Sequence, residues 1–385
     1  MTLSHCWGQF KFLSLVTENI DVFKKEIPFH ELPKTFQDAV TFTRSTLVKY
    51  IWIDSLCIVQ DSQRDWRRES LQMAHIYSNG FCNLSATSSP DGRQGLFFER
   101  NLSGYESVAI DVHSSPPKSP GDSKIPGRVK SLAIVVQRKV KKTKPVRFVL
   151  ESNFAPLGLY IIRDTSLWPR EVEESVLCQR GWVFQERLLA RRALHFTSRQ
   201  IWFECQEFRA CELSPKAGWQ EISDSRKADL NRNVEMAGSH NDTEFVKLRA
   251  LKSWKDMVSE YTVCALTRES DRLIAIAGLA RLMKLKIRCR YVAGLWDNDT
   301  LAEQLLWERY DGEMVHTDTY QAPTWSWASV KGKVSWVEAG LMISDSDSKP
   351  RVSILGVDTG TTDGNEMSQV ISVRSTPYRH ISSNR

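Results

Sequence analysis

The first hundred residues alternate between two patterns of apolar side chains, one with helical and one with strand-like spacing. Residues 35–48 place Phe, Val and Leu side chains on one face at helical spacing, which predicts a helix. Residues 50–59 are instead crowded with β-branched and aromatic side chains, as in a strand buried on both faces. A capped helix is expected to begin after Ser62, and a short strand to follow at residues 81–87. This order of helix and strand predicts right-handed crossovers and a parallel sheet.

Residues 100–165 interrupt this alternation and predict an antiparallel β insertion. Four short apolar runs have the length of strands: 107–112, 132–137, 147–150 and 159–162. Between the first two runs, residues 113–128 contain four Pro and four Ser, a composition that predicts a mobile loop. Beyond the insertion, residues 178–189 predict a short helix, and residues 193–205 predict two strands around a Thr-Ser-Arg turn. A first domain is therefore expected over residues 1–211.

Residues 212–340 predict a helical region followed by short strands. One apolar stripe at helical spacing is formed by Leu248, Leu251, Trp254, Val258 and Tyr261. A second stripe is formed by Leu273, Ile276, Ala277, Ala280 and Met283, and a third helix is expected from Thr300. The pattern turns strand-like after residue 322, and residues 341–385 predict a β-rich to disordered tail.

Composition is that of a soluble globular protein, since 41% of the 385 residues are hydrophobic and 25% are charged. The formal net charge is +6, but residues 128–147 alone hold eight basic and no acidic residues, which leaves the rest of the chain at −2. Nucleic-acid-binding surfaces spread their charge over a folded face. We therefore expect no nucleic-acid partner, and interpret the basic segment as a solvated loop and hairpin.

Other classes of protein are disfavoured by missing patterns. The longest apolar stretch, residues 273–280, is far shorter than the roughly 20 residues of a membrane helix. The N-terminal residues lack the pattern of a secretory signal, and the eight Cys residues include no Cys-x-x-Cys pair, which together predict a cytoplasmic protein with reduced thiols. No metal-ligand spacing, Walker loop or Gly-x-Gly-x-x-Gly motif is present, so we expect no bound metal and no nucleoside triphosphatase.

Three sequence blocks together resemble the fungal heterokaryon incompatibility (HET) domain family. They are Leu3-Ser-His-Cys-Trp-Gly8, residues 50–61 with their continuation to Tyr77, and Arg180-Gly-Trp-Val-Phe-Gln-Glu-Arg-Leu-Leu189. Further blocks at 275–280, 291–296 and 323–329 resemble the segment that follows the domain in long members of the family. The resemblance implies a role in nonself recognition with programmed cell death as the output. It also implies self-association or other cell-death proteins as partners.

Met1 stands only three positions before Ser4, where the family usually has a strand leading into this block. We therefore expect the first strand to be mostly missing. An inactive, N-terminally truncated member of the family is accordingly one interpretation of the chain.

The HET family is in turn distantly similar to the Toll/interleukin-1 receptor (TIR) fold, a flavodoxin-like parallel sheet with helices on both faces. In that comparison Leu3-Ser4 would end the first strand, residues 51–58 would be the second strand, and residues 60–65 would be the functional loop after it. Trp182 and Glu186 match the Trp-x-x-x-Glu of the helix that carries the catalytic glutamate in NAD-cleaving TIR domains. Open parallel sheets bind ligands at the carboxyl ends of their strands. This implies Glu186 as the catalytic residue and, as residues that bind NAD, Ser4, Trp7, Asp54, Gln60, Asp61 and Trp182.

Two readings of the function stay open at this level. In the first, the protein is a TIR-like NAD glycohydrolase that takes NAD as substrate and needs no prosthetic group. In the second, it is a non-enzymatic module that signals by homotypic assembly, and Glu186 is an ordinary surface carboxylate paired with an Arg. Asp54 either reaches the end of its strand and the ligand pocket or caps a neighbouring helix.

Overall fold

A computed structural model describes residues 1–100, 108–114, 132–137, 146–150, 158–162, 166–221, 227, 230, 243–310, 315–316, 320–336, 353–358 and 372–376. Most of the predicted loop 113–128, basic segment 128–147 and tail 341–385 lies outside these residues. The chain divides into two compact units, one formed by residues 1–99 with 171–385 and the other by residues 100–170.

A seven-stranded sheet organises the first unit, with strands in the order β11-β10-β9-β8-β3-β1-β2. The four strands at one end are parallel to one another: β2 (Trp52–Ile53), β1 (Thr2–Ser4), β3 (Asn83–Ser85) and β8 (Arg192–Phe196). Three strands continue the sheet in antiparallel fashion: β9 (Ile201–Cys205), β10 (Phe208–Cys211) and β11 (Ser214–Glu221). The predicted α/β class is confirmed, and the order β2-β1-β3 is the one that flavodoxin-like sheets use around their ligand crevice.

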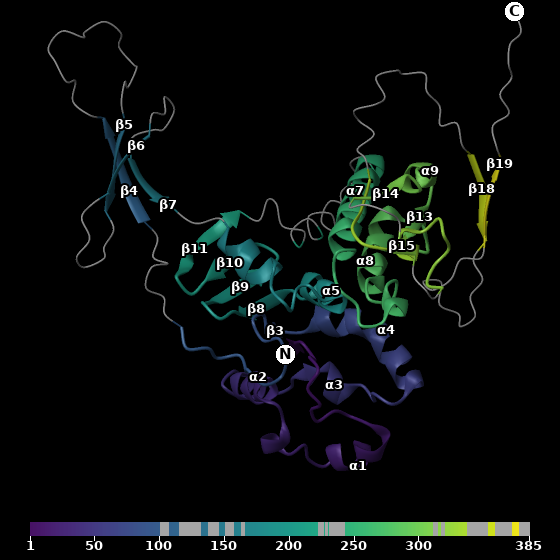
Figure 1. Ribbon diagram of the computed structural model, residues 1–385, viewed down its shortest axis with the longest axis horizontal. Helices are drawn as coiled ribbons and strands as arrows, with labels where there is room; N and C mark the ends of the chain where they lie inside the picture. Colours follow the sequence, from purple (N-terminus) through teal and green to yellow (C-terminus); the bar gives the residue numbers. More distant parts are fainter. Residues whose placement is uncertain are drawn as a thin grey trace, which may run out of the picture. The chain divides into compact units, whose positions relative to one another are not determined.

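Helices cover both faces of the parallel strands (Figure 1). On one face α2 (Lys34–Arg44) packs Phe36 and Ala39 against Leu3 and other apolar side chains of the sheet. On the other face lie α4 (Gln63–Asn79) and α5 (Gly181–Leu189), which contact each other and α8 (Ala277–Ile287). Because side chains alternate along a strand, Leu3 faces α2 while Ser4 faces α5. The short α1 (Ile20–Phe23) belongs to the segment before α2.

Two expectations about the first strands are wrong. The second strand was expected over residues 51–58, but β2 ends at Ile53 and the chain turns at once into α3 (Asp54–Cys57). The Asp54 carboxylate accepts a hydrogen bond from the Ser55 N–H at 2.7 Å, a local interaction that favours a turn over an extended strand. The first strand is also present: β1 has three residues, as many as β3, and it is paired on both sides.

The predicted β insertion forms a four-stranded antiparallel sheet in the order β6-β5-β4-β7. Its strands are β4 (Val108–Ser114), β5 (Leu132–Gln137), β6 (Val146–Leu150) and β7 (Gly158–Ile162). Their bounds lie within two residues of the four predicted runs.

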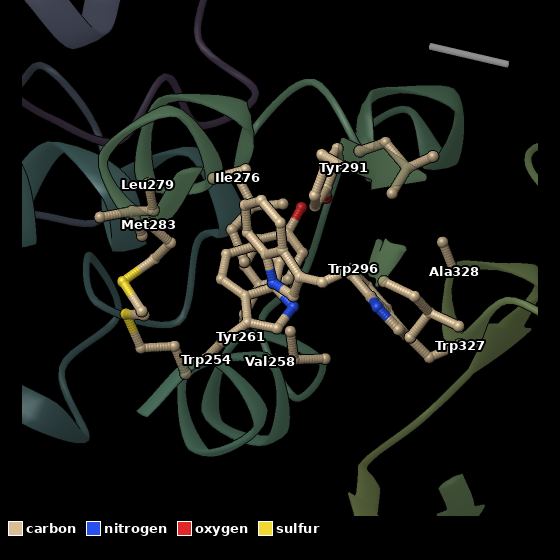
Figure 2. Packing of buried hydrophobic residues seen from close by; sticks show 14 of the residues in the cluster. Trp254, Val258, Tyr261, Ile276, Leu279, Met283, Tyr291, Trp296, Trp327 and Ala328 are labelled. Atoms are coloured by element: carbon tan, nitrogen blue, oxygen red, sulfur yellow. The ribbon is translucent and has the colours of Figure 1, made fainter. Parts of the chain in front are cut away.

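The C-terminal region begins with α7 (Thr243–Tyr261) and α8 (Ala277–Ile287), as the two apolar stripes predict. The short α9 (Leu301–Gln304) and antiparallel pairs of short strands follow: β12 (Arg290–Val292) with β13 (Leu295–Asp297), β14 (Trp307–Arg309) with β17 (Val334–Trp336), β15 (Val315–His316) with β16 (Val330–Lys331), and β18 (Ser353–Asp358) with β19 (Ser372–Thr376). Figure 2 shows the core of this region, where Trp254, Tyr291 and Trp296 stack edge to face. The same core includes Met73 and Tyr77 of α4 and Leu189 of α5, so it continues onto the helices that cover the sheet.

Gly294 stands in this core in a conformation that other residues avoid, with a φ of +96°. Its carbonyl accepts hydrogen bonds from the indoles of Trp254 and Trp327, both at 2.9 Å, and a side chain at Gly294 would overlap the Trp327 ring. We expect Gly294→Ala to lower the free energy of unfolding by about 2–4 kcal/mol through backbone strain and overpacking. Urea unfolding measures this loss. Gly80→Ala is the control, because its new methyl group would meet only ordinary contacts, and an equal loss in both variants would contradict the argument.

Candidate functional site

Glu186 and Ser4 meet at the carboxyl end of the central strand β1. Ser4 is the last residue of β1, and its Oγ donates a hydrogen bond of 2.5 Å to Glu186 Oε2 on α5. Asn83 of the neighbouring strand β3 donates from Nδ2 to Ser4 Oγ at 3.0 Å, which leaves the hydroxyl proton directed at the carboxylate. Both Ser4 and Glu186 are buried, with exposed fractions of 1% and 5%. The contact joins two sequence blocks that lie 182 residues apart.

Burial raises the pKa of the Glu186 carboxyl to about 7, because its charged form loses the solvation of water. The hydrogen bond from Ser4, the nearby Arg180 guanidinium and the nearby Tyr77 hydroxyl lower this pKa, whereas the Asp54 carboxylate raises it further. A carboxyl group with a pKa near neutrality exchanges protons readily at physiological pH. Such a strongly shifted acid at the carboxyl edge of a parallel sheet is typical of a functional site.

Asp54 joins Trp7 and His5 beside this pair. It lies at the end of β2, and its Oδ2 accepts a hydrogen bond of 3.0 Å from Trp7 Nε1. His5 Nδ1 lies 3.6 Å from Asp54 Oδ1, and the His5 ring packs edge to face on Phe36. Burial lowers the pKa of His5 to about 4, so this ring is neutral at physiological pH. Asp54 thus directly follows the end of its strand, and the ligand pocket that this reading also includes stays a prediction.

Gln60 and Asp61 do not join Glu186. The Gln60 side chain donates to the carbonyls of Asp54 and Ile58, at 3.2 and 2.8 Å, and so closes the turn after α3. Asp61 is exposed and accepts hydrogen bonds from Thr17 N and Thr17 Oγ1, at 2.9 and 3.0 Å. The backbone hydrogen bond from Thr17 lowers the pKa of Asp61. Asp61 therefore holds the segment before α1, and its hydrogen bonds are with Thr17 rather than with Ser4 or Glu186.

Trp182 lies one turn before Glu186 but is engaged elsewhere. Its Nε1 donates a hydrogen bond of 3.3 Å to Asp271 Oδ2, and its ring packs edge to face on Trp66. Trp182, which the resemblance implies as an NAD-binding residue, is therefore part of the contact between α5 and the C-terminal region.

The sequence did not single out three residues that surround Glu186. The Tyr77 hydroxyl donates to the Leu3 carbonyl at 3.4 Å and lies near enough to Glu186 to lower its pKa. Arg180 precedes α5 and donates from Nη1 to the His5 carbonyl. Asn83 orients Ser4. The only signal for Asn83 was a carboxamide within an apolar run, which needs a hydrogen-bonding partner when it is buried.

A second buried polar cluster surrounds Glu204 of β9. Arg187 Nε and Nη2 each lie 3.1 Å from one Glu204 oxygen, in a two-pronged arrangement. Arg209 Nη2 lies 3.4 Å and Lys227 Nζ 3.7 Å from Glu204, and His195 Nε2 lies 3.3 Å away. Burial would raise the pKa of Glu204, but Arg187 and Lys227 outweigh this effect and hold it well below its ordinary value. Burial lowers the pKa of His195 to about 4, so the imidazole stays neutral.

Within the described ranges, no helix is long and apolar enough to cross a membrane, and no group of three or more His, Cys, Asp or Glu side chains is arranged to hold a metal ion.

Comparison with known proteins gives one match. Residues 1–186 match the family model described as "Heterokaryon incompatibility protein (HET)", a range that begins before β1 and ends at Glu186. Neither the curated proteins nor the solved structures gave a match to this chain. The matched range contains both partners of the Ser4–Glu186 contact and agrees with the three sequence blocks quoted above. Residues 1–186 of this chain are therefore similar to the heterokaryon incompatibility (HET) family.

Proposed function

We propose that the HET domain hydrolyses NAD, with Glu186 as the catalytic residue, and that this activity triggers cell death in heterokaryon incompatibility. The observation that carries the proposal is the position of Glu186: a buried acid, presented by α5 to the carboxyl end of β1. In doubly wound sheets this edge, beside the point where the strand order reverses, is where nucleotides bind.

The chemistry would use Glu186 as a carboxylate. Breaking the bond between nicotinamide N1 and ribose C1′ leaves the bonding electrons on nicotinamide and positive charge on the ribose. A carboxylate beside the ribose stabilises that charge in the transition state, as in glycoside hydrolysis. Water then adds to C1′ and loses a proton, so that NAD and water give ADP-ribose, nicotinamide and one proton. Ser4, which donates to the Glu186 carboxylate, would favour its ionised form, and the nearby Tyr77 would act in the same direction.

Access to Glu186 would require a change in its surroundings. Only 5% of the residue is exposed, and its Oε2 atom is engaged by Ser4. The described arrangement is therefore the resting form in this proposal. In this proposal, self-association breaks the Ser4–Glu186 hydrogen bond. A second copy could do so because its own contacts would replace those that α5 loses.

The test is NAD consumption by the purified protein, followed by separation of nicotinamide and ADP-ribose at protein concentrations that favour assembly. We expect Glu186→Gln to reduce the rate at least about 100-fold, the scale expected when a transition-state charge loses its stabilising partner. The wild-type rate should rise with pH through about 7 as Glu186 ionises. Glu207→Gln, which changes an exposed carboxylate in the turn after β9, is the control. An assembled wild-type protein that leaves NAD intact would refute the enzymatic proposal.

The second candidate function is homotypic assembly without chemistry. Strand β2 lies at the end of the sheet, and the segment leading into it exposes Leu47 completely and Tyr50 to 82%. Exposed apolar side chains beside a sheet edge are suited to contacts between copies of a protein. Under this candidate, cells that express Glu186→Gln still die, whereas Leu47→Asp with Tyr50→Asp abolishes both assembly and death. Under the enzymatic proposal, Glu186→Gln alone prevents death.

A further inference from the structure

Helix α5 is held along one side by residues 265–278, which lie beyond the range matched by the HET family model. At the start of the helix, Gly181 N donates to the Ala265 carbonyl at 2.8 Å, and Ala265 N donates to the Gln179 carbonyl at 2.7 Å. One residue later, Trp182 reaches Asp271 through its indole N–H. These contacts fix the first turn of α5.

The middle of α5 is fixed by Gly278, near the start of α8. Gly278 N donates to Gln185 Oε1 at 3.2 Å, and Gln185 is the residue immediately before Glu186. Packing here is tight: a Cβ atom at Gly278 would lie 2.6 Å from Ala74 Cβ and 2.7 Å from Gln185 Oε1. A Cβ atom at Gly181 would likewise lie 2.6 Å from Leu266 Cδ2. Helix α5 therefore has little room to move against this segment.

The other side of α5 carries the polar side chains that matter for the site. Glu186 accepts from Ser4, and Arg187 pairs with Glu204. A nine-residue helix moves largely as a rigid body, so a displacement at Trp182 or Gln185 also displaces Glu186. The segment 265–278 can thus set how deeply the Glu186 carboxyl is buried.

We propose that Asp271 is a positioning residue, which acts through Trp182 and α5 to keep Glu186 buried against Ser4. Asp271 has an exposed fraction of 8%, and its carboxylate is the hydrogen-bond acceptor for the Trp182 indole. An Asn side chain offers the same acceptor oxygen, whereas an Ala side chain offers none. The importance of Asp271 for catalysis rests on the proposed function. Its effect on the position of Glu186 can be tested without any substrate.

The test compares Asp271→Ala with Asp271→Asn in the full chain. Carbon-13 NMR of glutamate carboxyls follows the titration of Glu186, and the Glu186→Gln variant assigns its signal. We expect the pKa of Glu186 to fall from about 7 toward the ordinary value of 4.5 in Asp271→Ala, because the freed helix lets water reach the carboxyl. In Asp271→Asn the pKa of Glu186 should stay near its wild-type value.

The control is Trp336→Phe, which removes an indole hydrogen bond of 2.8 Å to the Gln304 carbonyl in the same region without touching α5. It should lower stability while leaving the titration of Glu186 unchanged. An unchanged pKa of Glu186 in Asp271→Ala would overturn the inference. If that variant does not fold, Trp182→Phe removes the same hydrogen bond from the other partner. A lowered pKa of Glu186 in Trp182→Phe would then support the inference, and an unchanged pKa would overturn it. A wild-type protein that fails to cleave NAD but shows the expected titration would refute only the proposed function.

Discussion

Replacing Glu204 by Gln should cost about 3–5 kcal/mol of folding free energy, the range measured when one partner of a buried ion pair is removed. The carboxylate is 1% exposed and is the shared counter-ion of Arg187, Arg209 and Lys227. With a neutral amide in its place, these cations keep their desolvation cost and lose most of the opposing charge. Glu173, the other nearby carboxylate, is 42% exposed and lies 3.5 Å or more from both arginines, so it compensates little.

Urea unfolding at pH 7 measures this loss, with Glu207→Gln as the matched change of an exposed carboxylate. The difference between wild type and Glu204→Gln should shrink as the pH falls below 4.5, because the folded wild type then begins to lose the stability that its depressed pKa provides. A loss below about 1 kcal/mol at pH 7, the value typical of a surface pair, would show that the cluster is solvated rather than buried.

Glu186→Gln should have the opposite effect on stability and should raise it at alkaline pH. Burial raises the pKa of Glu186 from 4.5 to about 7 in the folded protein, so folding is favoured while the carboxyl is protonated. This contribution is fully present below pH 4.5 and is lost as the pH rises through about 7. The shift corresponds to about 3 kcal/mol, and Gln, which does not titrate, avoids the loss.

Unfolding curves for wild type and Glu186→Gln at pH 4 and pH 8 test this expectation. The variant should gain about 3 kcal/mol relative to wild type between the two pH values. The comparison variant is Asp65→Asn, which also replaces a carboxylate by an amide. Asp65 lies in the first turn of α4 and does not contact Ser4. A pH-independent difference would mean that Glu186 is ionised and solvated in the folded state. Stability given up for an ionisable group in a buried position is the pattern expected of a functional residue.

The sequence predicted those helices and strands whose spacing of apolar side chains reflects the burial of one face. The stripe Leu251, Trp254, Val258 and Tyr261 is buried on α7, as its spacing indicates, although Leu248 at its start is half exposed. The hairpin of β8 and β9 was found for the same reason. Residues 54–58 were misassigned because they lie within the run 50–59, whose β-forming residues are mostly at its two ends, and a side-chain hydrogen bond at Asp54 favours a turn there.

The site was predicted in part. Resemblance brought Ser4 and Glu186 together, and the structure joins them directly. The contact of Asp61 with Thr17 could not be predicted, because the segment before α1 has no strong pattern of its own. The Glu204 cluster could not be predicted, because its members come from α5, β8, β9, β10 and residue 227 and share no spacing along the chain.

Three consecutive polar side chains of α5 are directed at three different neighbours: Gln185 at α8, Glu186 at β1 and Arg187 at β9. Successive residues of a helix are rotated by about 100° about its axis. An inserted or deleted residue earlier in this helix would therefore turn all three side chains away from their partners at once. Natural variation in length should for this reason be confined to the connecting segments on either side of α5, and the helix itself should be inherited as an undivided block.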